Sequence, residues 1–306
     1  MYKFKLFLIL ILLFIILFFY FNFYNNKIYN NILEKYSDNA RVCFITAIYG
    51  SYESTCKSYV TQTIPTDFIC FTDNTSMISN GWIIDNTPYH ITHPSPLDNG
   101  TYTNSISNNK HTFNIAKYYK QAFQNIPILK KYDVIIWLDG TISIINKDTS
   151  EWILENIHKY KIIGWEHENR NGNLKAEMID SIGPEFRYTT TNWNNQIQPY
   201  QDIEKQYDEY IKDGYDETYF KNIFPNRSNM GVWITCFTAF LNNNEDVKKF
   251  LDLWYLQTLK YTTQDQIGFP YVCQKTGLIP YTLPDDKIKG IPHYCTYFYI
   301  KYAHGK

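Results

Sequence analysis

The chain has 306 residues, 44% of them apolar and 18% aromatic, which is enough to fill the core of one large or two small domains. Its formal net charge is −1 and no long basic run occurs, so the electrostatic attraction that nucleic-acid binding requires is missing. The composition therefore indicates a folded protein and argues against a nucleic-acid partner.

The first predicted element is a membrane-spanning helix at residues 6–24. Residues 6–21 carry no charge and no amide. At about 1.5 Å per residue the helix is about 28 Å long, close to the roughly 27 Å hydrocarbon thickness of an endoplasmic reticulum bilayer. The alternative is a cleaved signal peptide, but this apolar run is longer, and bulky aromatic residues follow it instead of a small-residue cleavage site. We therefore expect an uncleaved anchor.

Charges around this helix predict its orientation. Lys3, Lys5 and the amino terminus precede it, whereas only Lys27 follows closely, so the positive-inside rule keeps the amino terminus cytoplasmic. We expect a single-pass type II membrane protein of the Golgi or the endoplasmic reticulum, with the membrane as a partner and the rest of the chain lumenal. The expected order is a cytoplasmic tail, an anchor, a stem and one domain, at residues 1–5, 6–24, 25–40 and 41–306.

Cysteines and sequons are compatible with a lumenal domain. Six cysteines allow three disulfides in an oxidising compartment, and their pairing stays open. Cys43 and Cys70 lie in strand-like runs, where we expect small buried side chains. Sequons at Asn74, Asn99 and Asn226 give weak support, because a chain rich in asparagine produces them by chance.

Strand-like and helix-like segments alternate through the first half of the domain. Strands are predicted at 42–48, 67–72, 132–138, 160–165 and 229–235, and helices at 111–124, 149–158, 202–212, 247–260 and 264–275. Polar loops are predicted at 86–109 and 168–199, and an irregular tail beyond 277. The alternation predicts an α/β fold with a parallel sheet covered on both faces.

The residues that follow the predicted strands are the first candidates for a site, because ligands bind at the carboxyl ends of strands in open α/β sheets. Asp139 is the sharpest candidate. A carboxylate at the end of a buried strand, followed by Gly140, can hold a divalent cation against a diphosphate without steric obstruction. Its alternative is a plain turn, which Asp-Gly also favours.

Five segments resemble, in chain order, a family of glycosyltransferase-like proteins typified by plant mucilage-related and turgor-regulation-defect proteins. They are VCFITAIYG at 42–50, FICFTDN at 68–74 with Gly81 and Trp82, YDVIIWLDGTI at 132–142 preceded by Lys117 and Lys120, His167 with Arg170 and Glu177, and Asp265 with Gln266. The resemblance covers residues 41–273. It implies a type A glycosyltransferase fold, a Rossmann-like, mostly parallel sheet that binds a nucleotide sugar.

The resemblance also implies a divalent metal, Mn²⁺ or Mg²⁺. Many enzymes of that fold use an Asp-x-Asp motif, whereas this chain has Asp139, Gly140 and Thr141, so one carboxylate is missing. Thr141 is expected to bind a metal-bound water or a sugar hydroxyl. His293 is a candidate ligand from late in the chain, with a structural role as the alternative.

The resemblance and the strand ends together predict the donor site, with a UDP-sugar as the favoured donor. Its expected residues are Thr46, Ala47, Tyr49, Asp73, Lys117, Asn229, Gly231 and Gln266. Lys117 would pair with the departing diphosphate, or else belong to a solvated helix face. The segment around Gly231 resembles the Asn-x-Gly strand that places small residues beside the sugar, where a close backbone approach needs glycine.

The predicted catalytic residues are Asp265, Lys117, His167 and Glu177. In an inverting enzyme a carboxylate takes the proton from the attacking hydroxyl, and we expect Asp265 to do so. Its alternative is helix capping after Thr262 and Thr263. His167 and Glu177 follow the strand at 160–165, in a position suited to contact a carbohydrate acceptor.

The sequence thus predicts a membrane-anchored glycosyltransferase that acts on a glycan or glycoconjugate hydroxyl. The alternative is a catalytically inactive carbohydrate-binding or scaffold protein with the same fold, which the missing second carboxylate motivates. Hydrolase chemistry is disfavoured. His90 and His93 lie before a proline in a loop without the glutamate of a zinc protease, and the chain has no Gly-x-Ser-x-Gly elbow.

Overall fold

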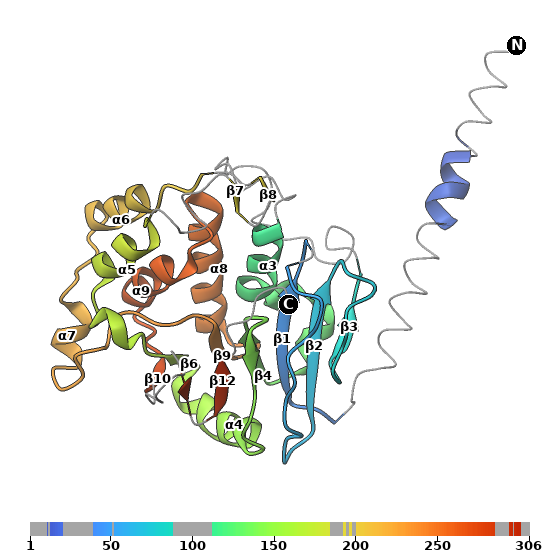
Figure 1. Ribbon diagram of the computed structural model, residues 1–306, viewed down its shortest axis with the longest axis horizontal. Helices are drawn as coiled ribbons and strands as arrows, with labels where there is room; N and C mark the ends of the chain where they lie inside the picture. The colour runs from blue at the N-terminus through green and yellow to red at the C-terminus, as the bar shows by residue number, and fades with distance from the viewer. Residues whose placement is uncertain are drawn as a thin grey trace, which may run out of the picture. The chain divides into compact units, whose positions relative to one another are not determined.

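The computed structural model in Figure 1 divides the chain into two units, Met1–Asp38 and Asn39–Lys306. It describes residues 11, 13–20, 39–50, 52–87, 112–183, 192–193, 196–197, 200–284, 294–295 and 297–300. In the first unit, residues 13–20 are helical. Within the described ranges, no helix has both the length and the apolar character that crossing a bilayer requires. The rest of the predicted anchor and the predicted stem up to residue 38 lie outside the described residues.

A seven-stranded sheet forms the centre of the second unit, in the order β10-β6-β9-β4-β1-β2-β3. The strands are β1 (Val42–Ile48), β2 (Thr66–Thr72), β3 (Ile83–Asp85), β4 (Val134–Leu138), β6 (Ile162–Trp165), β9 (Phe237–Leu241) and β10 (Tyr281–Leu283). All neighbouring pairs are parallel except those of β9, which runs antiparallel to β4 and β6. The prediction of a mostly parallel α/β sheet is therefore confirmed.

The described residues of this unit include seven helices: α3 (Thr112–Gln121), α4 (Thr149–Tyr160), α5 (Leu174–Ser181), α6 (Ile203–Lys212), α7 (Tyr219–Ile223), α8 (Glu245–Lys260) and α9 (Asp265–Thr276). Short 3₁₀ turns occur at Phe123–Asn125, Pro127–Lys131 and Glu168–Arg170. There are two small sheets in the described residues. In one, β12 (Phe298–Ile300) pairs with β5 (Ile142–Ser143) on one side and β11 (Tyr294–Cys295) on the other, and in the second β7 (Asn192–Trp193) pairs with β8 (Gln196–Ile197).

Alternation along the strands divides the core between the two faces of the sheet. In β4, Ile136 and Leu138 join the apolar cluster that contains Ile153 and Ile157 of α4. Trp137 has the opposite parity and lies beside Lys120 of α3. Helices α3 and α8 pack against each other, and α3 also packs on β1, so these two helices cover the second face (Figure 1).

Several predicted elements match the structure closely. Strand β1 has the predicted bounds, and β2, β4 and β6 differ from the predictions by one or two residues. The five predicted helices correspond to α3, α4, α6, α8 and α9, with ends that differ by up to three residues. Cys43 and Cys70 are buried as predicted.

The predicted strand at 229–235 is wrong, because the backbone turns at residues 228–231 and makes only an isolated bridge, between Glu166 and Trp233. Gly231 has φ +130°, and a Cβ there would lie 2.6 Å from the carbonyl oxygen of Gly172. The regular strand begins later, at Phe237. Close contact between two backbones therefore replaces strand pairing at this point.

Two regions predicted to be irregular contain regular structure. The predicted loop at 168–199 includes α5, whose first turn is capped by Asn173 accepting from the Ala176 amide. The predicted tail beyond 277 supplies β10, which pairs with β6 at the edge of the main sheet. Because β10 has only 3 residues, it is too short to show a period in the sequence.

Candidate active site

The candidate site lies at the carboxyl ends of β1 and β4, where the strand order reverses. From β1 the chain continues to β2 and β3 on one side, and β4 then pairs with β1 on the other side. The turn after β4 lies against the end of β1, because a Cβ on Gly140 would be 3.2 Å from Cδ1 of Ile48. Such a reversal is the usual ligand position in open α/β sheets.

Four predicted donor residues lie at this edge of the sheet. Asp73 accepts from the Gly50 amide at 3.1 and 3.2 Å and thereby joins the turns that follow β1 and β2. The Tyr49 hydroxyl donates to that of Tyr119 on α3 at 3.0 Å, and burial raises the pKa of Tyr49. Thr46 is buried and Ala47 half-buried near the end of β1. Tyr49 and Asp73 thus have structural contacts that order this edge.

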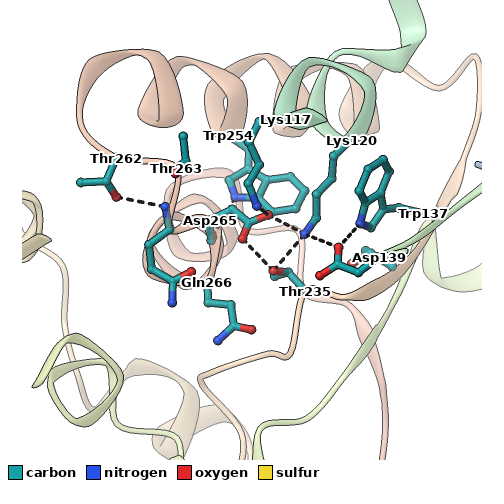
Figure 2. A network of polar contacts seen from close by, with 12 residues as sticks. Lys117, Lys120, Trp137, Asp139, Thr235, Trp254, Thr262, Thr263, Asp265 and Gln266 are labelled. Carbon is teal, nitrogen blue, oxygen red and sulfur yellow. Dashed lines mark hydrogen bonds and ion pairs between the residues drawn. The ribbon is translucent and has the colours of Figure 1, made fainter. Parts of the chain in front are cut away.

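A buried network of charged side chains occupies the centre of the site (Figure 2). Lys117 and Lys120 lie one helical turn apart on α3, and both ammonium groups contact Oδ2 of Asp265, at 2.8 and 2.5 Å. Lys120 also donates to the Thr235 hydroxyl at 3.2 Å, and Thr235 donates to Oδ1 of Asp265 at 3.1 Å. Two helices, α3 and α9, and the turn that carries Thr235 therefore meet at a single carboxylate.

Asp139 joins this network from the end of β4. Its Oδ1 accepts from Nε1 of Trp137 at 2.7 Å and lies 3.6 Å from Nζ of Lys120. The Asp139 side chain is 43% exposed, whereas those of Lys120 and Asp265 are 1% and 4% exposed. The network thus reaches solvent through Asp139, and Lys117, at 12%, is the more exposed of its two lysines.

Two tryptophan rings hold the Lys120 ammonium in place. Its Nζ lies 5.5 Å from the ring centroid of Trp137 and 5.8 Å from that of Trp254, distances at which an aromatic face attracts a cation. Nε1 of Trp254 donates to the backbone carbonyl of Asp265 at 3.0 Å. The same ring therefore helps to fix both members of the Lys120–Asp265 pair.

The charges in this network stabilise one another. Burial lowers the pKa of Lys120, but Asp139 and Asp265 outweigh burial and raise that pKa above its ordinary value. Burial likewise raises the pKa of Asp265, but Lys117 and Lys120 outweigh it and hold that pKa well below its usual range. At neutral pH Asp265 is consequently a carboxylate bound to two ammonium groups, and in this arrangement it is a poor general base.

The position of Asp265 follows from the way α9 begins. Gln264 is the N-cap residue of α9, and its backbone amide donates to the Thr262 hydroxyl at 3.2 Å. Asp265 is the first helical residue, where a negative charge is favoured by the helix dipole. Its side chain points to the lysines of α3 and does not cap the helix, so capping does not account for this residue.

A second buried cluster surrounds Glu177 of α5. Its carboxylate accepts from Arg170 at 2.5 Å, from Gln266 at 2.7 Å and from Gln264 at 3.0 Å, and Nε2 of His167 lies 3.6 Å away. Burial outweighs these contacts and raises the pKa of Glu177. Three predicted site residues, His167, Glu177 and Gln266, are thus brought together. The start of α9 separates this cluster from the lysine network.

The segment that carries Asn229 and Gly231 connects the two clusters. The Val232 carbonyl accepts from the His167 amide at 3.0 Å, and Gly231 packs against Gly172, so this end belongs to the Glu177 side. Ile163 pairs with Ala239 and Glu166 pairs with Trp233 in the antiparallel direction. Between these two pairs the chain advances three residues on the β6 side but six residues on the β9 side. The extra residues bulge out and place Thr235 in the lysine network.

The donor set around Asp139 does not fit a divalent metal. Within the described ranges, no group of three or more histidine, cysteine, aspartate or glutamate side chains could hold a metal ion. Oδ1 of Asp139 is already bonded to Trp137 and faces an ammonium group. Thr141 is half-buried in the turn before β5, and His293, the third predicted ligand, lies outside the described residues.

Sequence reasoning did not assign a role to Lys120, Thr235, Trp137 or Trp254. A signal for Lys120 existed, because it lies four residues after Ala116 and therefore on the apolar side of the predicted helix, where a lysine needs a buried partner. Thr235 gave no such signal. Its position depends on the bulge between β6 and β9, which only long-range pairing creates.

Comparisons with known proteins give only distant structural likenesses. No model of a protein family and no curated protein sequence matches the chain. The apo structure of the bifunctional glycosyltransferase WbbM aligns with a TM-score of 0.39 and 9% identity over 77% of this chain and 38% of WbbM. Core-mannan synthase A from Aspergillus fumigatus, in an Mn/GDP form, aligns with a TM-score of 0.39 and 11% identity over 81% of this chain and 73% of the synthase.

Mouse xyloside xylosyltransferase 1, in an apo form, aligns with a TM-score of 0.39 and 7% identity over 80% of this chain and 84% of the transferase. The aligned part of this chain spans well under half the length of WbbM. At this level of similarity the likenesses do not establish a common family or activity.

Proposed function

We propose that this chain is a glycosyltransferase that moves a sugar from a nucleotide diphosphate donor to a hydroxyl of a glycan or glycoconjugate. Residues 6–24 would tether it to the membrane of the Golgi or the endoplasmic reticulum, with the domain in the lumen. A UDP-sugar is the donor that we favour. Hexosyl and pentosyl transfer are both compatible with the site.

The observation that carries this proposal is the pair of lysines at the strand-order reversal of a mostly parallel sheet. Lys117 and Lys120 converge on one point beside Asp139, at the edge where such sheets bind ligands. When a glycosidic bond to a nucleotide diphosphate breaks, negative charge develops on the departing phosphate. Cations that are already in place stabilise that charge without reorganisation, which is usually a large part of catalysis.

The two carboxylates of the network have different exposures and therefore different expected roles. Asp139 is partly exposed and can accept hydrogen bonds from hydroxyl groups of the donor. Asp265 is buried and neutralised by the lysines. It can take a proton from an acceptor hydroxyl only after a lysine has moved from its carboxylate to the phosphate, since its pKa is otherwise too low.

A second candidate function is a catalytically inactive protein that binds carbohydrate or nucleotide sugars. The neutralised state of Asp265 favours it, because a carboxylate that stays bound to two ammonium groups cannot act as the base. Such a protein would bind a donor without turning it over. Both functions therefore predict binding of a nucleotide-sugar donor, but only the transferase predicts its turnover.

The experiment that tests the proposal uses the full-length chain purified in detergent. It is incubated with UDP-glucose, UDP-galactose, UDP-xylose and GDP-mannose, and donor binding and release of the nucleotide diphosphate are both measured. We expect turnover of at least one donor and a loss of tenfold or more in Lys117→Gln and Asp139→Asn. The matched control Asp148→Asn removes an exposed carboxylate that pairs with Lys147 and should behave like the wild type.

Binding without turnover would support the inactive alternative. If the wild-type chain neither bound nor hydrolysed any of these donors, with or without Mn²⁺, the transferase and an inactive protein that binds nucleotide sugars would both be refuted.

A further inference from the structure

We propose that the Lys117–Lys120 pair takes the place of a divalent metal, so that the site binds the diphosphate of its donor without any metal ion. This inference rests on the proposed function, since it concerns the same diphosphate. It differs from the sequence-based expectation of an Mn²⁺ or Mg²⁺ site at Asp139, Thr141 and His293.

The spacing of the two ammonium groups suits a diphosphate. Both nitrogens contact the same oxygen of Asp265, so they are no further apart than the 2.8 Å and 2.5 Å contacts added together. This is the scale of two adjacent phosphoryl groups. Lys117 can then donate to one phosphate, while the fixed charge of Lys120 lies within the distance of the adjacent one.

The charge beside Asp139 is the second reason. In a metal-dependent site, carboxylate oxygens converge on an empty position that the cation fills. Here the position next to Oδ1 of Asp139 holds the Trp137 indole NH at 2.7 Å and the Lys120 ammonium at 3.6 Å. A divalent ion on this oxygen would face a positive charge that is buried and cannot leave. The side chains thus supply positive charge where a metal would otherwise supply it.

The two lysines have different surroundings, which suggests different parts in binding. Lys120 is enclosed by Trp137, Trp254 and Thr235 and is only 1% exposed, so it stays in place as the fixed charge. Lys117 is more exposed and has a flexible four-carbon stem. It can turn from Asp265 to the phosphate while Lys120 continues to balance the buried carboxylate.

Asp265 competes with the ligand for Lys117, the lysine that can move. The four charged groups of the network, two lysines and two aspartates, sum to zero, so an incoming diphosphate has to displace a carboxylate contact. Asp265→Asn removes one negative charge and leaves the lysines for the ligand. We therefore expect this variant to bind nucleoside diphosphates more tightly than the wild type, whereas a site that used Asp265 to hold a metal would bind them more weakly.

The test is calorimetric titration of the full-length protein in detergent with UDP and with GDP, in EDTA and again in Mn²⁺ or Mg²⁺. We expect the Kd in EDTA to lie within about twofold of the Kd in metal. Lys117→Gln should weaken binding by about tenfold or more, the usual effect of losing a hydrogen bond to a charged group. Lys248→Gln, which removes an exposed lysine that pairs with Asp252 on α8, is the matched control and should bind as the wild type does.

The possible results separate this inference from the proposed function. Equal binding in EDTA that depends on Lys117 supports the lysine pair. Binding that requires Mn²⁺ or Mg²⁺, or that Lys117→Gln leaves unchanged, overturns the inference and leaves the transferase proposal standing. Failure to bind UDP or GDP under either condition counts against both. If Asp265→Asn does not fold, the EDTA comparison and the Lys117→Gln variant still decide the question.

Discussion

Replacing Asp265 by asparagine should destabilise the protein, and a second substitution should reverse most of the loss. Asp265→Asn leaves the fully buried Lys120 ammonium without its closest partner, which was at 2.5 Å. Breaking a buried pair by removing one member usually costs about 3–5 kcal/mol, because an uncompensated charge stays in the interior. Asp139 remains 3.6 Å from Lys120 and offsets part of this cost. We therefore expect a loss near the lower limit, about 3 kcal/mol.

Lys120→Met removes that stranded charge. Methionine has a similar length, and its thioether fits between the rings of Trp137 and Trp254, which now flank the ammonium. With asparagine at 265 and methionine at 120, the only lysine left in the network is Lys117, which is 12% exposed and can reach water. The double variant should thus be more stable than Asp265→Asn alone, by about 0.5–3 kcal/mol, the range usual for residues coupled in one network.

The free energy of unfolding is measured for the four proteins of this double-mutant cycle by denaturation, with tryptophan fluorescence as the signal. Trp137 and Trp254 lie within the network and report on it directly. The reasoning would be refuted if the two losses simply added, because the buried ammonium would then gain nothing from Asp265.

Three further predictions concern a backbone contact, the pH dependence of stability and glycosylation. Gly231→Ala should cost more than about 3 kcal/mol in unfolding free energy, since its Cβ would lie 2.6 Å from the Gly172 carbonyl at φ +130°. Gly214→Ala, at φ +84° in open space, should cost only about 1 kcal/mol, and equal losses would contradict the reasoning. Burial raises the pKa of Asp265, but the two lysines lower that pKa by more, so it is below the unfolded value of about 4. The stability that the carboxylate contributes is therefore complete above about pH 4, and it is lost progressively as the pH falls from there toward the lowered pKa of the folded state. The stability difference between wild type and Asp265→Asn should therefore shrink between about pH 5 and pH 3, and a constant difference would speak against the ion pairs. If the domain is lumenal, the exposed sequon at Asn226 should carry a glycan, seen as a mass shift that glycosidase and Asn226→Gln both remove, and an unmodified Asn226 in protein from a secretory-pathway host would count against the location.

The parts of the fold that could be predicted from the sequence are those with a strong local pattern. Strand β1 is a continuous β-branched and apolar run, and α8 has apolar residues at helical spacing, so both were found. The errors occur where pairing partners that are distant in the sequence decide the structure. Strand β10 exists because β6 presents an open edge to it, and the segment at 229–235 bends because Gly231 meets Gly172. Neither contact changes the spacing of apolar residues in the neighbouring sequence, which is the signal used for prediction.

The candidate site shows the same division. Asp139 and Asp265 could be predicted as site candidates because Asp139 follows β4 and Asp265 begins α9. The side chains around them, however, change the chemistry that these positions suggest. A carboxylate after a strand predicts a metal ligand, yet here Lys120 comes from α3 to lie beside it. An acidic residue at a helix start predicts a base, yet here two ammonium groups neutralise it. Both effects come from the two lysines of α3, so the residues at positions 117 and 120 decide the chemistry of this site together with the two aspartates.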